Sequence, residues 1–526
     1  MMKTKTILNL LFSMTVFAAC GGKDPSPAEK AEAPVLVSVE PADGSTDVGL
    51  DLKSVVFTYD QNVKVLTADQ SKVSISGGAA ITKVNAYGKA VTVSISGLNY
   101  EKTYTVTIPA GIVQGYKEDQ EMAAAASVSF TTLSKPDEGT SERESDVAWN
   151  LFGVLGLGWN LGNQLDAYSG NMPSETVWGN PKATQQTFDK VKAAGFSTVR
   201  IPVTWLGKIG AAPDYTIDAS WMARVTEVVG YAHNAGLNVI VNTHHDENHN
   251  DDHWLNLKDA PSNAALNTQI KEEITAVWTQ IANNFKDCGD WLFFEGFNEL
   301  NDGGWGWSAD FKADPTRQCN VLNEWMDCFV KAVRATGGNN ATRWLGIATY
   351  AANPNYVQYL KLPTDTASKL MISVHFYDPS DYTIGDAQYS DWGHTGAAGK
   401  KASGSDEDYV EALFKSLCYK YVNRGIPVYI GEFGCSMRNK ADSRAWAFYK
   451  YYMEYVVKAA HTYGLPAILW DNGAEGYGKE HHPYIHHGTG DYIGSSKEIV
   501  DVIVKAMTNT SSSYTLESLY NNAPVF

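Results

Sequence analysis

Two glutamates stand at the ends of hydrophobic runs that have the pattern of buried strands. Residues 291–300 (WLFFEGFNEL) end in Asn298 and Glu299, and residues 427–434 (PVYIGEFG) carry Glu432. In closed α/β barrels, catalytic groups project from the carboxyl ends of such parallel strands. A single glutamate in this place is better explained by capping a strand or by pairing with an arginine than by catalysis. Two such glutamates, at the ends of strands that lie three strand–helix units apart, favour a pair of catalytic carboxylates.

The chain around these glutamates alternates between strand-like and helix-like segments from Val147 onward. Amphipathic helical stretches occur at 184–194, 221–235, 271–285, 322–335 and 445–460. Eight strand-like runs alternate with them, at 156–163, 198–205, 238–245, 292–299, 343–350, 371–377, 427–434 and 466–473. This pattern predicts an α/β fold, a (β/α)8 TIM barrel with long loops over residues 147–526.

Polar residues end nearly every predicted strand, where packing alone does not require them. They are Asn163, Arg200, His244, His245, Asn298, Glu299, His375, Tyr377, Glu432 and Trp470, the last an aromatic residue with one polar group. Because the carboxyl ends of barrel strands meet at one face, we expect these side chains to surround a single site.

The motifs that contain these residues resemble glycoside hydrolase family 5, in its endo-β-1,4-glucanase branch. They are GWNLGNQLDA (158–167), RIPVTW (200–205), NTHH (242–245), FNE (297–299), HFY (375–377), GEFG (431–434) and LWDNG (469–473). Each motif is weak alone, but their order and their places at strand ends are specific. The resemblance implies an endo-acting glucanase that needs no cofactor and no metal and binds β-glucan, including xyloglucan.

The resemblance also implies roles for single residues. Glu299 matches the general acid/base and Glu432 the nucleophile of a retaining mechanism. Arg200 would keep Glu432 ionised, and His375 and Tyr377 would orient the two carboxylates.

The remaining motif residues match positions that bind the sugar. Asn298 would hold the 2-hydroxyl, and Trp470 would form a stacking floor, after which the family commonly has a non-proline cis peptide bond. Asn163, His244 and His245 fall at further substrate-binding positions.

Two departures from the family pattern affect subsites, and one further glutamate needs an explanation. Gln164 stands where the glucanase pattern has Thr, and Leu300-Asn301 stands where Pro-Arg is commoner. Glu295 and Glu299 point to the same face of the predicted strand, but Glu295 comes earlier in it and so lies deeper in the barrel. We therefore predict that Glu295 is the buried partner of a barrel cation such as Arg200.

Other histidine and tryptophan clusters have simpler interpretations. Residues 244–253 (HHDENHNDDH) and 481–487 (HHPYIHH) lack the HExxH spacing of a zinc site, so we interpret them as loops around the active site. Six tryptophans lie at or beyond strand ends and are candidates for sugar subsites, about half of them being expected to serve packing: Trp178, Trp205, Trp254, Trp305, Trp307 and Trp392.

The N-terminal part predicts export and a separate small domain. Residues 1–20 have a short basic start and an apolar stretch that ends in Ala-Ala-Cys, which resembles a lipoprotein signal with Cys20 as the lipidated residue. An ordinary secretory signal is the alternative. Residues 21–33 are rich in Pro, Ala and Glu, as in a tether. We therefore expect a protein anchored by lipid to a bacterial membrane, at the outer membrane or cell surface.

Residues 34–134 contain seven short alternating runs, which predict an all-β, antiparallel, immunoglobulin-like sandwich. This sandwich resembles bacterial immunoglobulin-like modules, which implies a spacer. A carbohydrate-binding role is the alternative, although all fifteen tryptophans lie at or after Trp149. Polar residues 135–146 are expected to link it to the barrel.

Charge and cysteine content narrow the possible partners. The formal net charge is −17 without a basic cluster, which argues against nucleic acid. The six cysteines show no CxxC spacing, so the sequence indicates no disulfide framework and no zinc site. We expect a monomer. A β-1,4-mannanase or xylanase and a non-catalytic surface glycan-binding lipoprotein stay open as rival functions.

Overall fold

A computed structural model describes residues 32–50, 52–117, 120, 122–133, 139–247, 253–385, 389–402 and 404–526. The chain divides into two compact units, residues 1–137 and 138–526, and each is described by itself. Cys20 and the proposed signal and tether up to residue 31 lie outside the described residues. Within the described ranges, no helix is both long enough and apolar enough to cross a membrane.

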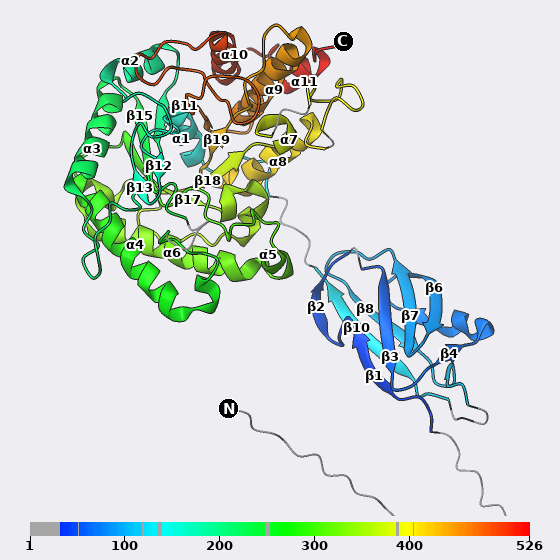
Figure 1. Cartoon of the computed structure of the whole chain (residues 1–526). Helices are drawn as coiled ribbons and strands as arrows, with labels where there is room; N and C mark the ends of the chain where they lie inside the picture. The colour runs from blue at the N-terminus through cyan, green and yellow to red at the C-terminus, as the bar shows by residue number, and fades with distance from the viewer. Residues whose placement is uncertain are drawn as a thin grey trace, which may run out of the picture. The chain divides into compact units, whose positions relative to one another are not determined.

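The first unit is a β-sandwich, as the alternating runs predict (Figure 1). One sheet has the order β1-β3-β7-β6 and the other β2-β10-β8-β5, with β4 and β9 as a separate pair. The strands are β1 (Leu36–Glu40), β2 (Ser45–Val48), β3 (Ser54–Tyr59), β4 (Lys64–Val65), β5 (Ser74–Ile75), β6 (Ala80–Tyr87), β7 (Ala90–Ser96), β8 (Thr103–Ile108), β9 (Val113–Gln114) and β10 (Ala126–Thr132), with a 3-10 helix at Thr67–Lys72.

The sandwich differs from the expectation in one pairing. Strand β2 runs parallel to β10, whereas an antiparallel sandwich was predicted. The sequence of β2, STDV, is too polar and too short to show the alternation by which strands are recognised.

The second unit is a closed barrel of eight parallel strands, so the predicted TIM barrel is confirmed (Figure 1). The strands are β11 (Leu157–Asn160), β14 (Thr198–Ile201), β15 (Asn238–Asn242), β16 (Leu292–Glu295), β17 (Leu345–Ala348), β18 (Leu370–Phe376), β19 (Val428–Phe433) and β20 (Ala467–Leu469). Only the first residue of β15 is not buried, which explains why these strands read as hydrophobic runs.

Helices surround the barrel and bury their apolar faces against it. They are α1 (Val147–Leu155), α2 (Gln185–Ala193), α3 (Ala219–Asn234), α4 (Ala264–Asn284), α5 (Ala309–Ala313), α6 (Pro315–Ala335), α7 (Ser380–Thr383), α8 (Glu407–Lys420), α9 (Ser443–Thr462), α10 (Ser496–Thr508) and α11 (Leu516–Asn521), with 3-10 turns at Ala260–Ser262, Gly338–Ala341, Tyr350–Ala352, Pro354–Tyr359 and Val422–Arg424. A short hairpin, β12 (Tyr168–Ser169) with β13 (Met172–Pro173), follows the first barrel strand.

A separate apolar cluster closes the amino end of the barrel. Leu151 and Leu155 of α1 pack there with inward-facing residues of five strands: Ile240, Phe293, Met371, Tyr429 and Ile468. Since this end is filled, a ligand site has to lie at the carboxyl ends of the strands, where the polar residues gather.

Candidate active site

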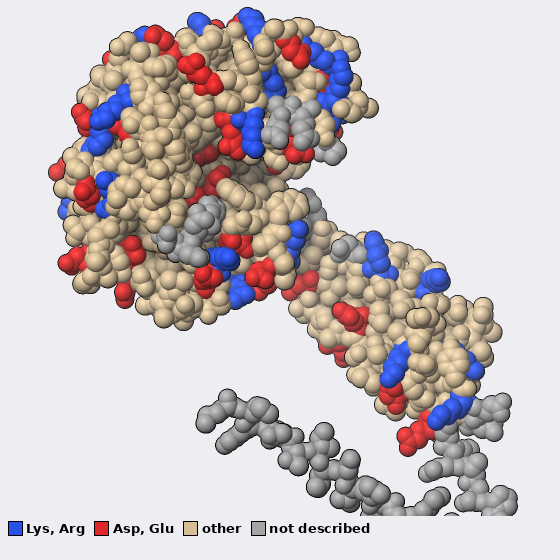
Figure 2. Space-filling view, viewed as in Figure 1, with Lys and Arg blue, Asp and Glu red and all other residues tan. Residues whose placement is uncertain are grey.

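A cleft of about 900 Å³ opens at the carboxyl end of the barrel. Figure 2 shows the hollow, with acidic side chains inside it. All of the predicted site residues line it except Arg200: Asn163, His244, His245, Asn298, Glu299, His375, Tyr377, Glu432 and Trp470. Arg200 is fully buried beneath it. The expectation of one shared site therefore agrees with the structure.

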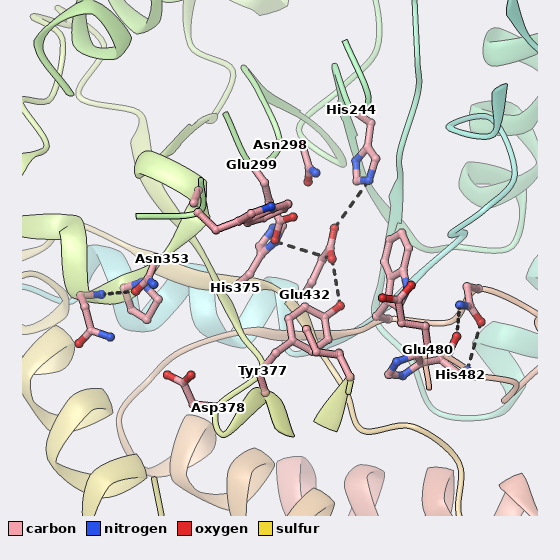
Figure 3. A pocket seen from close by; sticks show the side chains of 18 of the residues that line it. His244, Asn298, Glu299, Asn353, His375, Tyr377, Asp378, Glu432, Glu480 and His482 are labelled. Atoms are coloured by element: carbon pink, nitrogen blue, oxygen red, sulfur yellow. Dashed lines mark hydrogen bonds and ion pairs between the residues drawn. The ribbon is translucent and has the colours of Figure 1, made fainter. Parts of the chain in front are cut away.

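The two glutamates face each other across a short gap (Figure 3). One carboxylate oxygen of Glu299 lies within 4.8 Å of one from Glu432. Retaining glycosidases hold their carboxyl groups about 5–5.5 Å apart, whereas inverting enzymes leave about 6.5–9.5 Å for a water molecule. The short gap favours direct attack by one carboxylate over attack by an interposed water.

Arg200 connects three side chains at the base of the cleft. Its guanidinium donates to Glu295 Oε1 at 2.7 Å, to Glu432 Oε1 at 2.8 Å and to Asn298 Oδ1 at 2.7 Å. Glu295 is thus the buried partner that its position in the strand predicts. Because Asn298 accepts with its oxygen, its Nδ2 is left as the donor toward the cleft.

Burial and these charges determine the ionisation of Glu295 and Glu432. Burial acts to raise the pKa of Glu295, but Arg200 outweighs it and the pKa is lowered, so this carboxylate stays ionised. Burial raises the pKa of Glu432 above its ordinary value, against the lowering effects of His375 and Arg200. Tyr377 donates its hydroxyl to Glu432 Oε2 at 3.0 Å, which favours the ionised form.

Two histidines beside the carboxylates are neutral at neutral pH. Burial lowers the pKa of His375 to about 4 and that of His244 well below its ordinary value. The Nδ1 of His375 lies 2.6 Å from Glu299 Oε1, so the neutral ring donates to this carboxylate. His244 receives a hydrogen bond on Nδ1 from Asn242 at 3.1 Å, which directs Nε2–H toward Glu432.

His245 has the opposite charge state. Burial acts to lower its pKa, but Glu247 and Asp166 raise it to about 9. It therefore carries a positive charge at neutral pH, beside two acids at 3.4 and 3.7 Å.

Trp470 contributes a flat aromatic face to the cleft. Its ring is parallel to His244, with centroids 5.8 Å apart and an angle of 4°. A Cβ at Gly162 would lie 2.8 Å from this ring, so only glycine fits there. The expectation of a cis bond after Trp470 is wrong: the cis bonds of the described residues all precede proline. A trans bond is the form favoured, by about 3 kcal/mol, for a non-proline residue such as Asp471.

The six candidate tryptophans divide as expected between binding and packing. Trp178, Trp305 and Trp307 line the cleft and are at least 40% exposed. Trp205 and Trp392 are buried in the core, and Trp254 donates to Asp246.

The two departures from the family pattern have different places. Gln164 is fully buried and bonds to Glu175 and to the carbonyl of Pro181, so it braces a loop and does not reach the cleft. Asn301 is also fully buried, but it shapes the loop that carries Trp305.

Several cleft residues were missed by sequence reasoning. They are Asn353, Asn355, Asp378, Tyr409, Glu480 and His482. His482 belongs to the histidine-rich segment that we assigned to a loop, and burial lowers its pKa to about 3. The others lack a distinctive spacing, although Asp378 directly follows Tyr377 at the end of a predicted strand.

Two groups in the described part of the chain have ligand atoms close enough for an ion. They are Asp166, His244 and His245, and Glu299, His375 and Glu432. In the first group His245 lies 3.4 Å from Glu247, and in the second Glu432 is paired with Arg200 at 2.8 Å.

Comparisons with known proteins agree with this geometry. The profile of the cellulase family, glycosyl hydrolase family 5, matches residues 162–476, and that of a bacterial Ig-like domain matches residues 30–132. Endoglucanase A of Paenibacillus barcinonensis is 36% identical over 370 residues, which are 68% of this chain and 89% of that protein. The xyloglucan-specific endo-beta-1,4-glucanase of Bacteroides ovatus is 33% identical over 398 residues, 73% of this chain and 76% of that protein.

A solved structure gives the same result. The GH5-4 broad specificity endoglucanase from Bacteroides salanitronis is 48% identical, with a TM-score of 0.67 over 70% of this chain and 97% of that one. The chain therefore belongs to glycosyl hydrolase family 5, the cellulase family, and it is a glycosidase.

Proposed function

We propose that this glycosidase is a retaining endo-β-1,4-glucanase in which Glu432 is the nucleophile and Glu299 the general acid/base. The observation that carries the proposal is the gap of at most 4.8 Å between their oxygens, with Arg200 on Glu432 and neutral His375 on Glu299. This asymmetry supports an ionised Glu432 and a Glu299 that exchanges protons with the substrate.

The reaction proceeds in two displacements. Glu432 attacks the anomeric carbon while Glu299 gives its proton to the leaving oxygen, and a glycosyl-enzyme ester forms. Glu299 then takes a proton from a water molecule, which attacks the same carbon and releases Glu432. Each displacement inverts the configuration, so the product retains that of the substrate.

The surrounding residues orient the sugar at the cleavage point. Asn298 offers Nδ2 to the 2-hydroxyl, and Trp470 provides the face on which that sugar ring stacks. Asn163, His244 and His245 line the same part of the cleft as polar contacts for sugar hydroxyls.

The substrate class is a β-1,4-glucan, with tolerance of xylosyl branches. An open cleft of about 900 Å³ and relatives named as endoglucanases and as a xyloglucan-specific enzyme support this choice. Turnover should be faster on mixed-linkage glucan and xyloglucan than on mannan or xylan. Faster turnover of linear mannan would assign the enzyme to the mannanase alternative, and no reducing ends from any of the four would favour the non-catalytic one.

Azide rescue tests the two roles. Glu299→Ala still forms the glycosyl-enzyme from an activated aryl β-glucoside but lacks the base that activates water, so azide should restore turnover and give the β-glycosyl azide. Glu432→Ala lacks the nucleophile, so azide should attack from the vacated face and give the α-azide. Exchanged stereochemistry would reverse the roles, and inversion by the unmutated enzyme would reject the retaining mechanism.

We also propose export and a lipid anchor at Cys20, supported by the residues Ala18-Ala19-Cys20 at the end of a short apolar stretch. Stable attachment takes more than one acyl chain, as on a bacterial lipoprotein. Cys20→Ser should move the protein from the membrane fraction to the soluble fraction. An unchanged fractionation would reject the anchor.

A further inference from the structure

Strand β19 brings Glu432 into the cleft against the simple alternation of a strand. Val428 and Ile430 belong to the core between the barrel and its helices, whereas Tyr429 belongs to the apolar cluster inside the barrel. Strict alternation would therefore turn Glu432 outward, with Val428 and Ile430. In the structure Glu432 lines the cleft, and Phe433 lies in the outer core. The alternation of side chains thus shifts between Ile430 and Glu432.

One extra residue in β19 causes this shift. The strand takes three steps from Tyr429 to Glu432, but their partners on β18, Ser373 and His375, are only two steps apart. The register with β20 contains the same excess of one residue. Gly431 has no partner in either register, and β18 and β20 are both described over their full lengths. The strand therefore contains a β-bulge, a feature that redirects a side chain and is common next to active sites.

The bulge leaves no room for a side chain. A Cβ at Gly431 would lie 3.0 Å from Ser373 Oγ and 3.1 Å from His375 Nε2, closer than an ordinary contact. Ser373 donates to Glu295 and His375 lies 2.6 Å from Glu299, so neither neighbour can move without disturbing a carboxylate. The glycine is therefore required by the place of the bulge beside the two acids.

The side-chain amide of Asn160 holds the backbone of the bulge. Asn160 ends β11 and is fully buried. Its Nδ2 donates to the carbonyl of Gly431 at 2.9 Å, with longer contacts of 3.3 and 3.4 Å to two carbonyls of β20. Its Oδ1 accepts from Arg200 Nη1 at 3.0 Å, and the same Nη1 donates to Glu432 Oε1 at 2.8 Å. One amide thus connects the backbone next to Glu432 with the guanidinium that binds its carboxylate.

Asn160 acts on the reaction from outside the cleft. It is not among the described residues that line the cleft, so its effect has to pass through Glu432 and Arg200. A nucleophile misplaced by about 1 Å loses rate by on the order of a hundredfold, so the group that fixes its backbone matters for the attack. We propose that Asn160 is a positioning residue, which holds the bulge at Gly431 and the guanidinium of Arg200 together so that Glu432 faces the anomeric carbon. This inference rests on the proposed function and adds a residue to it.

The pH profile offers a readout that a purely structural role would not change. The titratable groups that face Glu432 are Arg200, His244, Glu299, His375 and Tyr377. Figure 3 shows the contacts of Glu432 with His244 and Tyr377. Asn160 carries no charge, so replacing it alters the pKa of Glu432 by moving the carboxylate relative to these groups. A looser contact with the guanidinium of Arg200 destabilises the ionised form and raises that pKa.

The test uses an aryl β-cellobioside with a good leaving group, for which kcat/KM reports the attack by Glu432. Asn160→Leu keeps the heavy-atom shape of the side chain but neither hydrogen bond. It should lower kcat/KM at least about tenfold and move the acidic limb of kcat/KM upward by about one pH unit. The Kd for cellotriose, measured by calorimetry, should change less than about threefold, because the residues that line the cleft are intact. Asn160→Ser keeps one hydroxyl and should fold even where Asn160→Leu does not, with a smaller shift in the same direction.

Asn340 provides a matched control. It is also fully buried, donates from Nδ2 to the carbonyl of Ala282 at 2.7 Å and accepts on Oδ1 from Arg343 at 2.7 Å, but it precedes β17 at the amino end of the barrel. Asn340→Leu should lower the free energy of unfolding in urea and leave kcat/KM and its acidic limb unchanged.

Three outcomes would overturn the positioning role of Asn160. They are an unmoved acidic limb in the Asn160 variants, the same shift in Asn340→Leu, and a loss of cellotriose binding as large as the loss of kcat/KM. Failure of the unmutated enzyme to cleave both the aryl cellobioside and the glucans would reject the proposed function itself.

Discussion

Arg200 is the residue on which the charge balance of the site depends. It is fully buried between Glu295 and Glu432, and neither carboxylate has another cationic side chain at hydrogen-bonding distance among the described residues. Removing one partner of a buried ion pair leaves an uncompensated charge, which costs about 3–5 kcal/mol. Arg200→Met should therefore lower the free energy of unfolding by about this amount and reduce kcat/KM at least about a hundredfold.

A double variant separates the two effects. Arg200→Met with Glu295→Gln removes the buried Arg200–Glu295 pair but leaves Glu432 without its cation and keeps one of the two oxygens that accept from Asn242 and Tyr429, so part of the stability should return. Activity should not return, because Glu432 still lacks the guanidinium. Urea unfolding followed by tryptophan fluorescence measures both variants. A double variant as unstable as the single one would contradict this account of Arg200.

The acidic limb of the pH profile depends on the ionisation of Glu432. Since burial raises its pKa, the limb should lie above the ordinary range of a glutamate. Tyr377 donates to the ionised carboxylate, so Tyr377→Phe removes a stabiliser of that form and should move the limb of kcat/KM upward by about one pH unit. Tyr409→Phe is the control, because its hydroxyl bonds Asp378 in the same cleft. A downward shift in Tyr377→Phe would contradict the assignment.

Helix α4 carries a carboxyl group on the face that packs against the barrel. Glu273 lies among Ile270, Ile274 and Val277, and burial, followed by repulsion from Asp246, raises its pKa to about 7. A carboxyl with a raised folded-state pKa contributes stability below about pH 4.5, and this contribution is lost as the pH rises through about 7.

Glu273→Met should remove that loss. The variant should be more stable than the parent by on the order of 2 kcal/mol above pH 7, with the difference shrinking toward pH 4.5. Thermal unfolding between pH 4 and 8 measures it. Glu272→Met, at the exposed neighbouring position, is the control and should show no such pH-dependent gain. A constant difference across the range would show that packing, not ionisation, is responsible.

The elements differ in how far the sequence predicts them. The barrel strands are nearly all buried and end in polar residues, so periodicity alone located all eight and the site they surround. The loop 301–308 could not be predicted in the same way. Its shape depends on side-chain bonds from Asn301 and Asp302 and on the space beside Tyr356, and these come from tertiary structure. Strand β2 was missed because its sequence is short and polar and because its partner among the described residues, β10, lies about 85 residues further along the chain.

At the scale of the whole molecule, the boundary between the two units lies after Asp137. The polar segment 135–146 was expected to be a linker throughout, but its second half is bonded to the barrel unit. Thr140 donates its amide to the carbonyl of Tyr419 at 3.0 Å and accepts from Asn423 Nδ2 at 2.9 Å. Glu144 donates its amide to the carbonyl of Asn423 at 2.8 Å. A polar composition does not distinguish a free linker from a segment that forms hydrogen bonds with the barrel unit.

Two truncated chains test where the catalytic unit begins. The described residues that line the cleft all belong to the second unit, so a chain of residues 139–526 should keep kcat/KM on soluble mixed-linkage glucan within twofold of the full chain. A chain of residues 147–526 loses four hydrogen bonds to Tyr419 and Asn423, the three above and one from the amide of Ser145 to the carbonyl of Asn423 at 3.1 Å. With a net value of about 1 kcal/mol for each, its free energy of unfolding in urea should fall by about 3–4 kcal/mol. Asn423 would also lose the partner of its Nδ2, while its Oδ1 still accepts from Trp149 of α1. Local unfolding should therefore begin at α1, where this helix closes the amino end of the barrel. Equal stability of the two chains would show that residues 139–146 are a linker after all.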